Sequence, residues 1–90
     1  MSTMGLAATP RVAAMFRLQW EEAQQSWVLL YPEGMVRLNG SAGEIMQRLD
    51  GLKTVQALVD ELERKFQVQD LQADVLDFLA HAASQGWIKA

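Results

Sequence analysis

The sequence predicts an α+β domain, a winged helix-turn-helix-like arrangement in which a three-stranded antiparallel sheet is followed by three helices. Three observations favour it: strand-like patterns in residues 16–38, helical periodicity with end signals from residue 41 onward, and a length that suits one core. The chain has 90 residues, of which 50% are hydrophobic and 21% charged. A chain of this size and composition buries a single core and folds as one domain.

Three short segments have the pattern of β-strands. In residues 16–21 apolar and polar side chains alternate, which is typical of a half-buried strand. The continuous apolar run at 27–31 predicts a second strand that is covered on both faces or is central. Pro32 and Gly34 supply turn chemistry, so we expect residues 35–38 to form a third strand that pairs back on the second.

Two helices follow the predicted sheet. Ser41 and Glu44 have the spacing of a capping box, which predicts that the first helix begins at Ser41 and ends before Asp50-Gly51. Thr54 is expected to cap the second helix. That helix has one apolar stripe, formed by Val55, Leu58, Val59, Leu62 and Phe66. Its other side is predicted to be an ordinary solvated face, made of Asp60, Glu61, Glu63, Arg64 and Lys65.

The third predicted helix has an unusually wide apolar surface. Asp70 is expected to cap it and Gly86 to end it, so that it covers about residues 71–85. At 100° per residue its apolar arc spans roughly 220°, against the ~100° or more that one-sided packing requires. Either part of this helix faces a partner, or alanines merely widen an arc that the sheet and the other helices cover from two sides.

Residues 1–15 are predicted to form a flexible N-terminal arm ahead of a domain at 16–90. A short helix is the alternative, because the segment is rich in alanine, but Pro10 and the lack of an amphipathic stripe favour the arm. The segment lacks the basic start and compact apolar block of a secretory signal, and no apolar stretch approaches the roughly 20 residues of a membrane span. We therefore expect a cytoplasmic protein without a membrane partner.

The chemistry of the side chains argues against an enzyme. The chain has no cysteine and a single histidine, His81. His81 follows Asp77 by four residues, a spacing that more often gives a salt-linked surface pair than a catalytic dyad. Asp74 and Asp77 have no further acidic cluster to complete a metal site, and the glycines do not form a phosphate-binding motif. We expect no catalytic residue, no metal and no cofactor.

Charge argues against nucleic acid as the partner. The formal net charge is −3, and residues 71–85, which would be the recognition helix of a winged-helix protein, contain no Lys or Arg and two Asp. A winged-helix regulator that binds DNA is the alternative function, and a purely structural homodimer module is a third. Recognition of another polypeptide is the function class that the residues favour.

Four segments carry a resemblance to a known family: FRLQWE at 16–21, LYPEGMVRLNGSAGEI at 30–45, LDG at 49–51 and DVLDFL at 74–79. On these segments the sequence resembles the pyrroloquinoline quinone (PQQ) biosynthesis protein D (PqqD) family, whose members are recognition elements for ribosomally synthesised, post-translationally modified peptides. The resemblance runs in the family's order from about Pro10 to the C-terminus.

The resemblance implies a peptide chaperone that is not itself an enzyme. Members of the family bind the precursor peptide PqqA and present it to PqqE, a radical S-adenosylmethionine enzyme that joins a glutamate to a tyrosine. The peptide adds a strand to the third strand and packs over the third helix. Here that implies an edge formed by Met35, Val36, Arg37 and Leu38, and a wall formed by Leu71, Asp74, Val75, Phe78, Leu79 and Ala82. An open edge also allows a homodimer.

Overall fold

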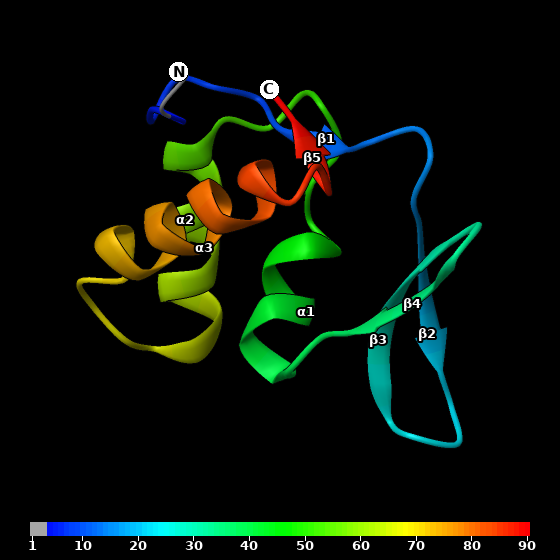
Figure 1. Cartoon of the computed structure of the whole chain (residues 1–90). Helices are drawn as coiled ribbons and strands as arrows, with labels where there is room; N and C mark the ends of the chain where they lie inside the picture. The colour runs from blue at the N-terminus through cyan, green and yellow to red at the C-terminus, as the bar shows by residue number, and fades with distance from the viewer. Residues whose placement is uncertain (1–3) are drawn as a thin grey trace.

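The computed structural model describes residues 4–90 and has the predicted α+β order. A three-stranded antiparallel sheet and three helices make up most of the chain, and two further two-residue strands pair with each other (Figure 1). The elements are β1 (Arg11–Val12), β2 (Arg17–Glu21), β3 (Ser26–Tyr31), β4 (Gly34–Arg37), α1 (Gly40–Met46), α2 (Val55–Phe66), α3 (Gln72–Ser84) and β5 (Ile88–Lys89).

The larger sheet confirms the strand predictions. Its order is β2-β3-β4, with each strand antiparallel to the next in the chain. The apolar run at 27–31 lies in β3, the central strand, where Val28 and Leu29 are both 0% exposed. Next to the turn of the β2–β3 hairpin, the rings of Trp20 and Trp27 pack edge to face with 5.6 Å between their centroids.

The predicted caps of α1 and α2 differ in outcome. The capping box at Ser41 is wrong: Asn39 caps α1, and its side-chain Oδ1 accepts a hydrogen bond from the Ala42 amide at 2.8 Å. Asn39 has the extended backbone that a cap requires, whereas Ser41 already lies inside the helix. The Thr54 cap of α2 is confirmed, since its Oγ1 accepts from the Ala57 amide at 3.1 Å.

The two ends of α3 differ in how well the sequence predicts them. The Asp70 cap is wrong: Asp70 has a left-handed backbone with φ of 63°, and the Leu71 amide donates instead to Glu63 Oε2 at 3.0 Å. The Gly86 stop is confirmed. Gly86 has φ of +78°, and the paired bonds from Gly86 N to the Ala83 carbonyl and from Trp87 N to the Ala82 carbonyl, both 3.0 Å, form a Schellman motif.

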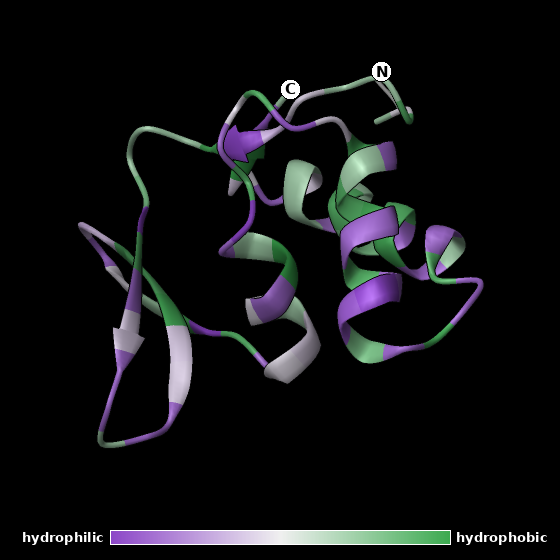
Figure 2. Cartoon of the chain, turned by 180° about the vertical axis from the view of Figure 1, so that it is seen from behind, coloured by the Kyte–Doolittle hydropathy of each residue, from purple (hydrophilic) through white to green (hydrophobic). Residues whose placement is uncertain are grey.

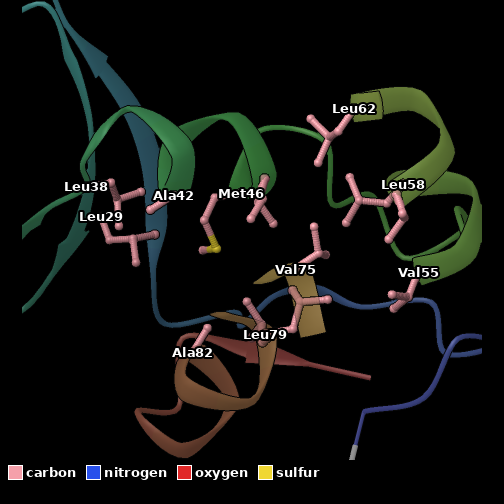
Figure 3. Packing of buried hydrophobic residues seen from close by; sticks show 13 residues of the cluster. Leu29, Leu38, Ala42, Met46, Val55, Leu58, Leu62, Val75, Leu79 and Ala82 are labelled. Carbon is pink, nitrogen blue, oxygen red and sulfur yellow. The ribbon is translucent and has the colours of Figure 1, made fainter. Parts of the chain in front are cut away.

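The core lies where the sheet and the three helices meet (Figure 3). α1 packs on the inner face of β3, and α2 packs on α3. Figure 2 shows hydrophilic residues on the outer side of α2, as the amphipathic pattern predicts. The fully buried side chains that hold the elements together include Leu29, Met46, Val55, Leu58, Val59 and Leu79.

The segment before β2 makes main-chain hydrogen bonds to the rest of the domain. The carbonyls of Leu6 and Ala8 accept hydrogen bonds from the amides of Gln56 and Val55 at 3.0 and 2.9 Å, at the start of α2. The end of the segment forms β1, which pairs with β5. This pairing was not predicted, because an alanine-rich segment has no periodic pattern and the partner strand has only two residues. Residues 1–3 lie outside the described residues.

Deleting residues 1–9 is expected to lower the free energy of unfolding by about 2–4 kcal/mol. The deletion removes two hydrogen bonds to the start of α2, worth about 0.5–1.5 kcal/mol each, and the packing of Met4 and Leu6 on the core. Urea unfolding followed by circular dichroism measures the change, with the exposed Ala7→Ser variant as control. An unchanged midpoint would instead support the flexible arm.

Candidate functional site

The outer edge of β4 has main-chain groups that no strand pairs with among residues 4–90. The Leu38 amide donates to the Trp27 carbonyl at 3.0 Å, so Leu38 belongs to a hydrogen-bonded pair with β3. Hydrogen-bonding direction alternates along an antiparallel strand, and therefore Gly34 and Val36 also face β3. The amide and carbonyl groups of Met35 and Arg37 consequently point outward, away from the sheet.

The side chains of the predicted edge residues divide between the two faces of the sheet. Val36 is half-buried and Leu38 is buried, and both pack on the core together with Phe78 of α3. Met35, 48% exposed, and Arg37 lie on the opposite face. A strand added to β4 would thus place alternate side chains on the face that also holds α3.

A small groove joins the end of β4 to α3. It has a volume of about 230 Å³ and is the place where the predicted edge and the predicted wall meet. Arg37 and Leu38 line it from the strand and Phe78 from the helix; the other lining residues are Asn39, Ala42, His81 and Trp87. His81 packs edge to face against Trp87, with 5.4 Å between ring centroids. The expected ion pair of His81 with Asp77 is absent from the part of the chain that the structure describes.

A larger groove adjoins the small one. It has a volume of about 600 Å³, within the range of ligand-binding pockets, and lies between α1, the end of α2 and α3. Ala42 and Phe78 line both grooves, so the two are neighbours on the surface. The predicted wall residues Leu71, Asp74 and Val75 line only the larger groove; the others are Gly40, Ser41, Glu44, Ile45, Leu62, Phe66 and Val68.

Two predicted wall residues are not on the surface. Leu79 and Ala82 are both 0% exposed and belong to the core (Figure 3), so they can support the wall but have no surface to offer a ligand. The apolar arc of α3 therefore has two environments. One part packs on the core, and the part around Leu71 and Phe78 lines the grooves.

Several groove residues were missed by the sequence analysis. Phe66 was assigned to the buried stripe of α2, but it is 45% exposed at the mouth of the larger groove. α2 ends at Phe66, and Gln67 turns into a left-handed conformation, so no element covers the last turn. The exposed Val68 and the ring of Trp87 had no periodic signal to distinguish them from loop residues.

An ion-pair network fixes α1 to α2 beside the larger groove. Arg48 donates to Glu44 Oε1 at 2.7 Å and to Glu61 Oε2 at 2.8 Å, and Lys53 also pairs with Glu61. Hydrogen bonds from Lys53 and Arg48 hold the pKa of Glu61 below its ordinary value. The charged side of α2 is therefore not only a solvated face, because Glu61 and Glu63 both make tertiary contacts.

Replacing Glu61 with glutamine should make stability less sensitive to acid. The folded-state pKa of Glu61 is lowered from 4.5, so its stabilising effect is present above that pH and is lost as the pH falls through the lower folded-state value. Because the pair is partly exposed, we expect Glu61→Gln to cost less than about 1 kcal/mol at pH 7. The difference from the unaltered protein should shrink below about pH 4.5 in thermal melts.

The matched control for this change is Glu33→Gln, in the exposed turn between β3 and β4. Glu33 makes no ion pair among residues 4–90, and its replacement should leave the acid limb of the melting curve unchanged. A Glu61→Gln variant with the same pH profile as the unaltered protein would show that the network does not contribute to stability.

The site offers main-chain groups and apolar surface more than reactive side chains. In residues 4–90, no cluster of three or more His, Asp and Glu side chains could hold a metal ion. No helix in this part of the chain is long and apolar enough to cross a membrane. The arrangement is suited to holding an extended polypeptide, through the outward groups of β4 and the grooves against α3.

Comparison with known proteins agrees with this geometry. Residues 26–88 match the family model described as coenzyme PQQ synthesis protein D (PqqD). The chain belongs to the PqqD family. A protein of Pseudomonas aeruginosa named PqqA binding protein is 47% identical over 90 residues, covering 99% of this chain and 98% of the relative. A PqqA binding protein of Methylococcus capsulatus is 44% identical over 78 residues, covering 87% of this chain and 84% of its own.

A solved structure supports the winged-helix-like fold of this PqqD-family chain. It is the solution NMR structure of the PqqD truncation of Methylobacterium extorquens PqqCD, described as a functional, stand-alone recognition element for ribosomally synthesised and post-translationally modified peptides. The two chains superpose with a TM-score of 0.79 over 100% of each and share 26% sequence identity. Recognition of a peptide in PQQ biosynthesis is thus the function of the family to which this chain belongs.

Proposed function

We propose that this chain binds the precursor peptide PqqA by strand addition to β4 and presents it to the radical S-adenosylmethionine enzyme PqqE, without catalysing a reaction itself. The observation that carries the proposal is the combination of an unpaired strand edge with a largely apolar groove at its end. The names of the relatives support the choice of peptide.

The strand edge alone would bind weakly. Met35 and Arg37 offer two amides and two carbonyls, and each net hydrogen bond contributes about 0.5–1.5 kcal/mol. Ordering a disordered peptide costs several kcal/mol, which largely offsets these bonds. Apolar side chains of the peptide must therefore contribute, at about 1.5–3 kcal/mol for each large residue buried in the grooves. The sum suggests a binding free energy of about −8 kcal/mol, which corresponds to low micromolar affinity.

Strand addition is also compatible with presentation to an enzyme. A peptide paired with β4 would become the new edge strand, and its outer main-chain groups and alternate side chains would remain accessible. A micromolar complex dissociates readily enough to release the peptide after modification. These properties support a role as a chaperone that holds its peptide extended for a second protein.

The DNA-binding alternative gains no support from the surface of α3. Asp74 and Asp77 are both exposed on this helix, and it has no Lys or Arg. Such a surface would repel a phosphate backbone, whereas DNA recognition helices require cations that displace counterions.

Titration of the ¹⁵N-labelled chain with synthetic PqqA tests the proposal. We expect the largest shifts at the amides of Met35 and Arg37 and around Phe78, because these groups would contact the peptide. Shifts confined to β2, or no shifts at millimolar peptide, would contradict it. Gel-shift titration with duplex DNA at low salt gives the comparison for the alternative function.

Replacing Phe78 with alanine should weaken PqqA binding by about tenfold or more. Phe78 is the large side chain that lines both grooves, and its loss removes apolar surface worth about 1.5–3 kcal/mol. Calorimetry measures the affinity, and a thermal melt of each variant separates lost contact from unfolding. Leu71→Ala is the second variant, and exposed Leu52→Ala is the control. Equal affinity in stable Phe78 and Leu71 variants would place the peptide elsewhere.

A further inference from the structure

The larger groove has features that go beyond a wall for an added strand. β4 ends at Arg37, and after Leu38 and Asn39 the chain enters α1, whose residues Gly40 and Ala42 line this groove. Because Phe78 lines both grooves, a peptide that continues past the end of β4 would pass Phe78 to reach the larger groove. No residue of β4 lines the larger groove, so contacts there would be made by peptide residues outside the added strand.

The mouth of the larger groove is apolar and exposed. Phe66 and Val68 are 45% and 42% exposed, and they border an interior that includes Ile45 and Leu62. Exposed large apolar side chains around a concave site are typical of a surface that another molecule covers. A bulky apolar side chain that entered the groove would cover these two residues.

The larger groove has acidic side chains at its border. Its ionisable residues are Glu44 and Asp74. Glu44 is already paired with Arg48. The Asp74 carboxylate makes no hydrogen bond or ion pair with any residue from 4 to 90, so its charge is available to a ligand.

From these observations, and resting on the proposed function, we infer that the larger groove is an anchor site for one bulky apolar side chain of the bound peptide, flanked by a lysine or arginine that pairs with Asp74. Phe66 and Asp74 are then specificity-determining residues, the first for size and the second for charge.

Two pairs of variants test the anchor site by calorimetry with synthetic PqqA. Phe66→Ser should weaken binding about tenfold, whereas Leu52→Ser, at an 83% exposed position that lines neither groove, should not change it. Asp74→Asn should weaken binding about threefold at low salt, with little difference at high salt, because the ion pair is exposed and screened. Asp77→Asn, on the same helix but outside both grooves, should bind normally.

The outcomes separate the anchor site from the proposed function. If Phe66→Ser and Asp74→Asn bind PqqA as the unaltered chain does, while substitutions at the β4 edge abolish binding, the anchor site is wrong and strand addition stands. If the unaltered chain binds no PqqA, both are overturned. Thermal melts of all four variants guard against unfolding as the cause of a loss, and a salt-independent loss in Asp74→Asn would contradict the assigned ion pair.

Discussion

Proline in place of Met35 or Arg37 is expected to abolish PqqA binding while the domain stays folded. Both residues point their amides outward, so proline removes a donor that β3 does not use. An edge strand tolerates proline at such positions. The variants lose one bond to the peptide, and the proline ring also hinders close approach of a neighbouring strand. Calorimetry should then show at least a 100-fold loss of affinity. A low micromolar Kd would rise above about 100 μM, where binding is barely detectable.

The matched control is proline at Val36, between the two test positions. Its amide faces β3, so Val36→Pro removes a bond within the sheet and should destabilise the fold itself. Circular dichroism and thermal melts distinguish the two classes of variant. Retained PqqA binding in folded Met35→Pro and Arg37→Pro variants would refute pairing at β4.

Replacing Gly43 with alanine is expected to destabilise the domain, although alanine favours helices. A Cβ atom at this position would lie 2.8 Å from Trp27 Cδ1 and 3.2 Å from Trp27 Cβ. The second atom is next to the backbone of β3, so rotation of the ring cannot relieve the contact, and α1 must move away from the sheet. Overpacking costs about 1–3 kcal/mol, and the helix propensity of alanine returns up to about 1 kcal/mol. We therefore expect a net loss of about 1–2 kcal/mol.

Gly40→Ala provides the comparison within the same helix. A Cβ atom at Gly40 would meet no other atom within 4 Å, so this change should leave stability unchanged or slightly raise it. Thermal melts of the two variants should differ by roughly 4–8 °C for each kcal/mol. Equal melting temperatures would mean that α1 and β3 have room to adjust, and that Gly43 is not needed for their close approach.

The pattern of apolar residues predicted the helices and strands well, because the burial of one face of an element determines where its apolar residues lie. The continuous run in β3 and the stripe of α2 up to Leu62 correspond to buried faces, whereas in β2 Leu18 is only half-buried and Trp20 is exposed. The helix caps were less predictable, since several polar residues at each boundary are competent to cap. Asn39 and Ser41 both have suitable side chains, and the extended backbone of Asn39 decides between them. The left-handed backbone of Asp70 has no sequence signal of this kind.

The candidate site was predictable only in part. Four of the wall residues that the family resemblance implies line the grooves. The apolar periodicity of α3 does not say where the core ends and the surface begins. Leu79 and Ala82 lie on the core side of that boundary. Phe66 is the last residue of α2, His81 lies near the end of α3, and Trp87 directly precedes β5. Only the tertiary fold brings these three residues beside Phe78.

The pairing of β1 with β5 has a practical consequence for how this chain can be joined to other proteins. It brings Arg11 beside Lys89, so β1 and the C-terminal strand lie side by side. Trp87, which lines the small groove, comes directly before β5. An enzyme fused after Ala90 would therefore be tethered close to the small groove, where it would meet a high local concentration of the bound peptide.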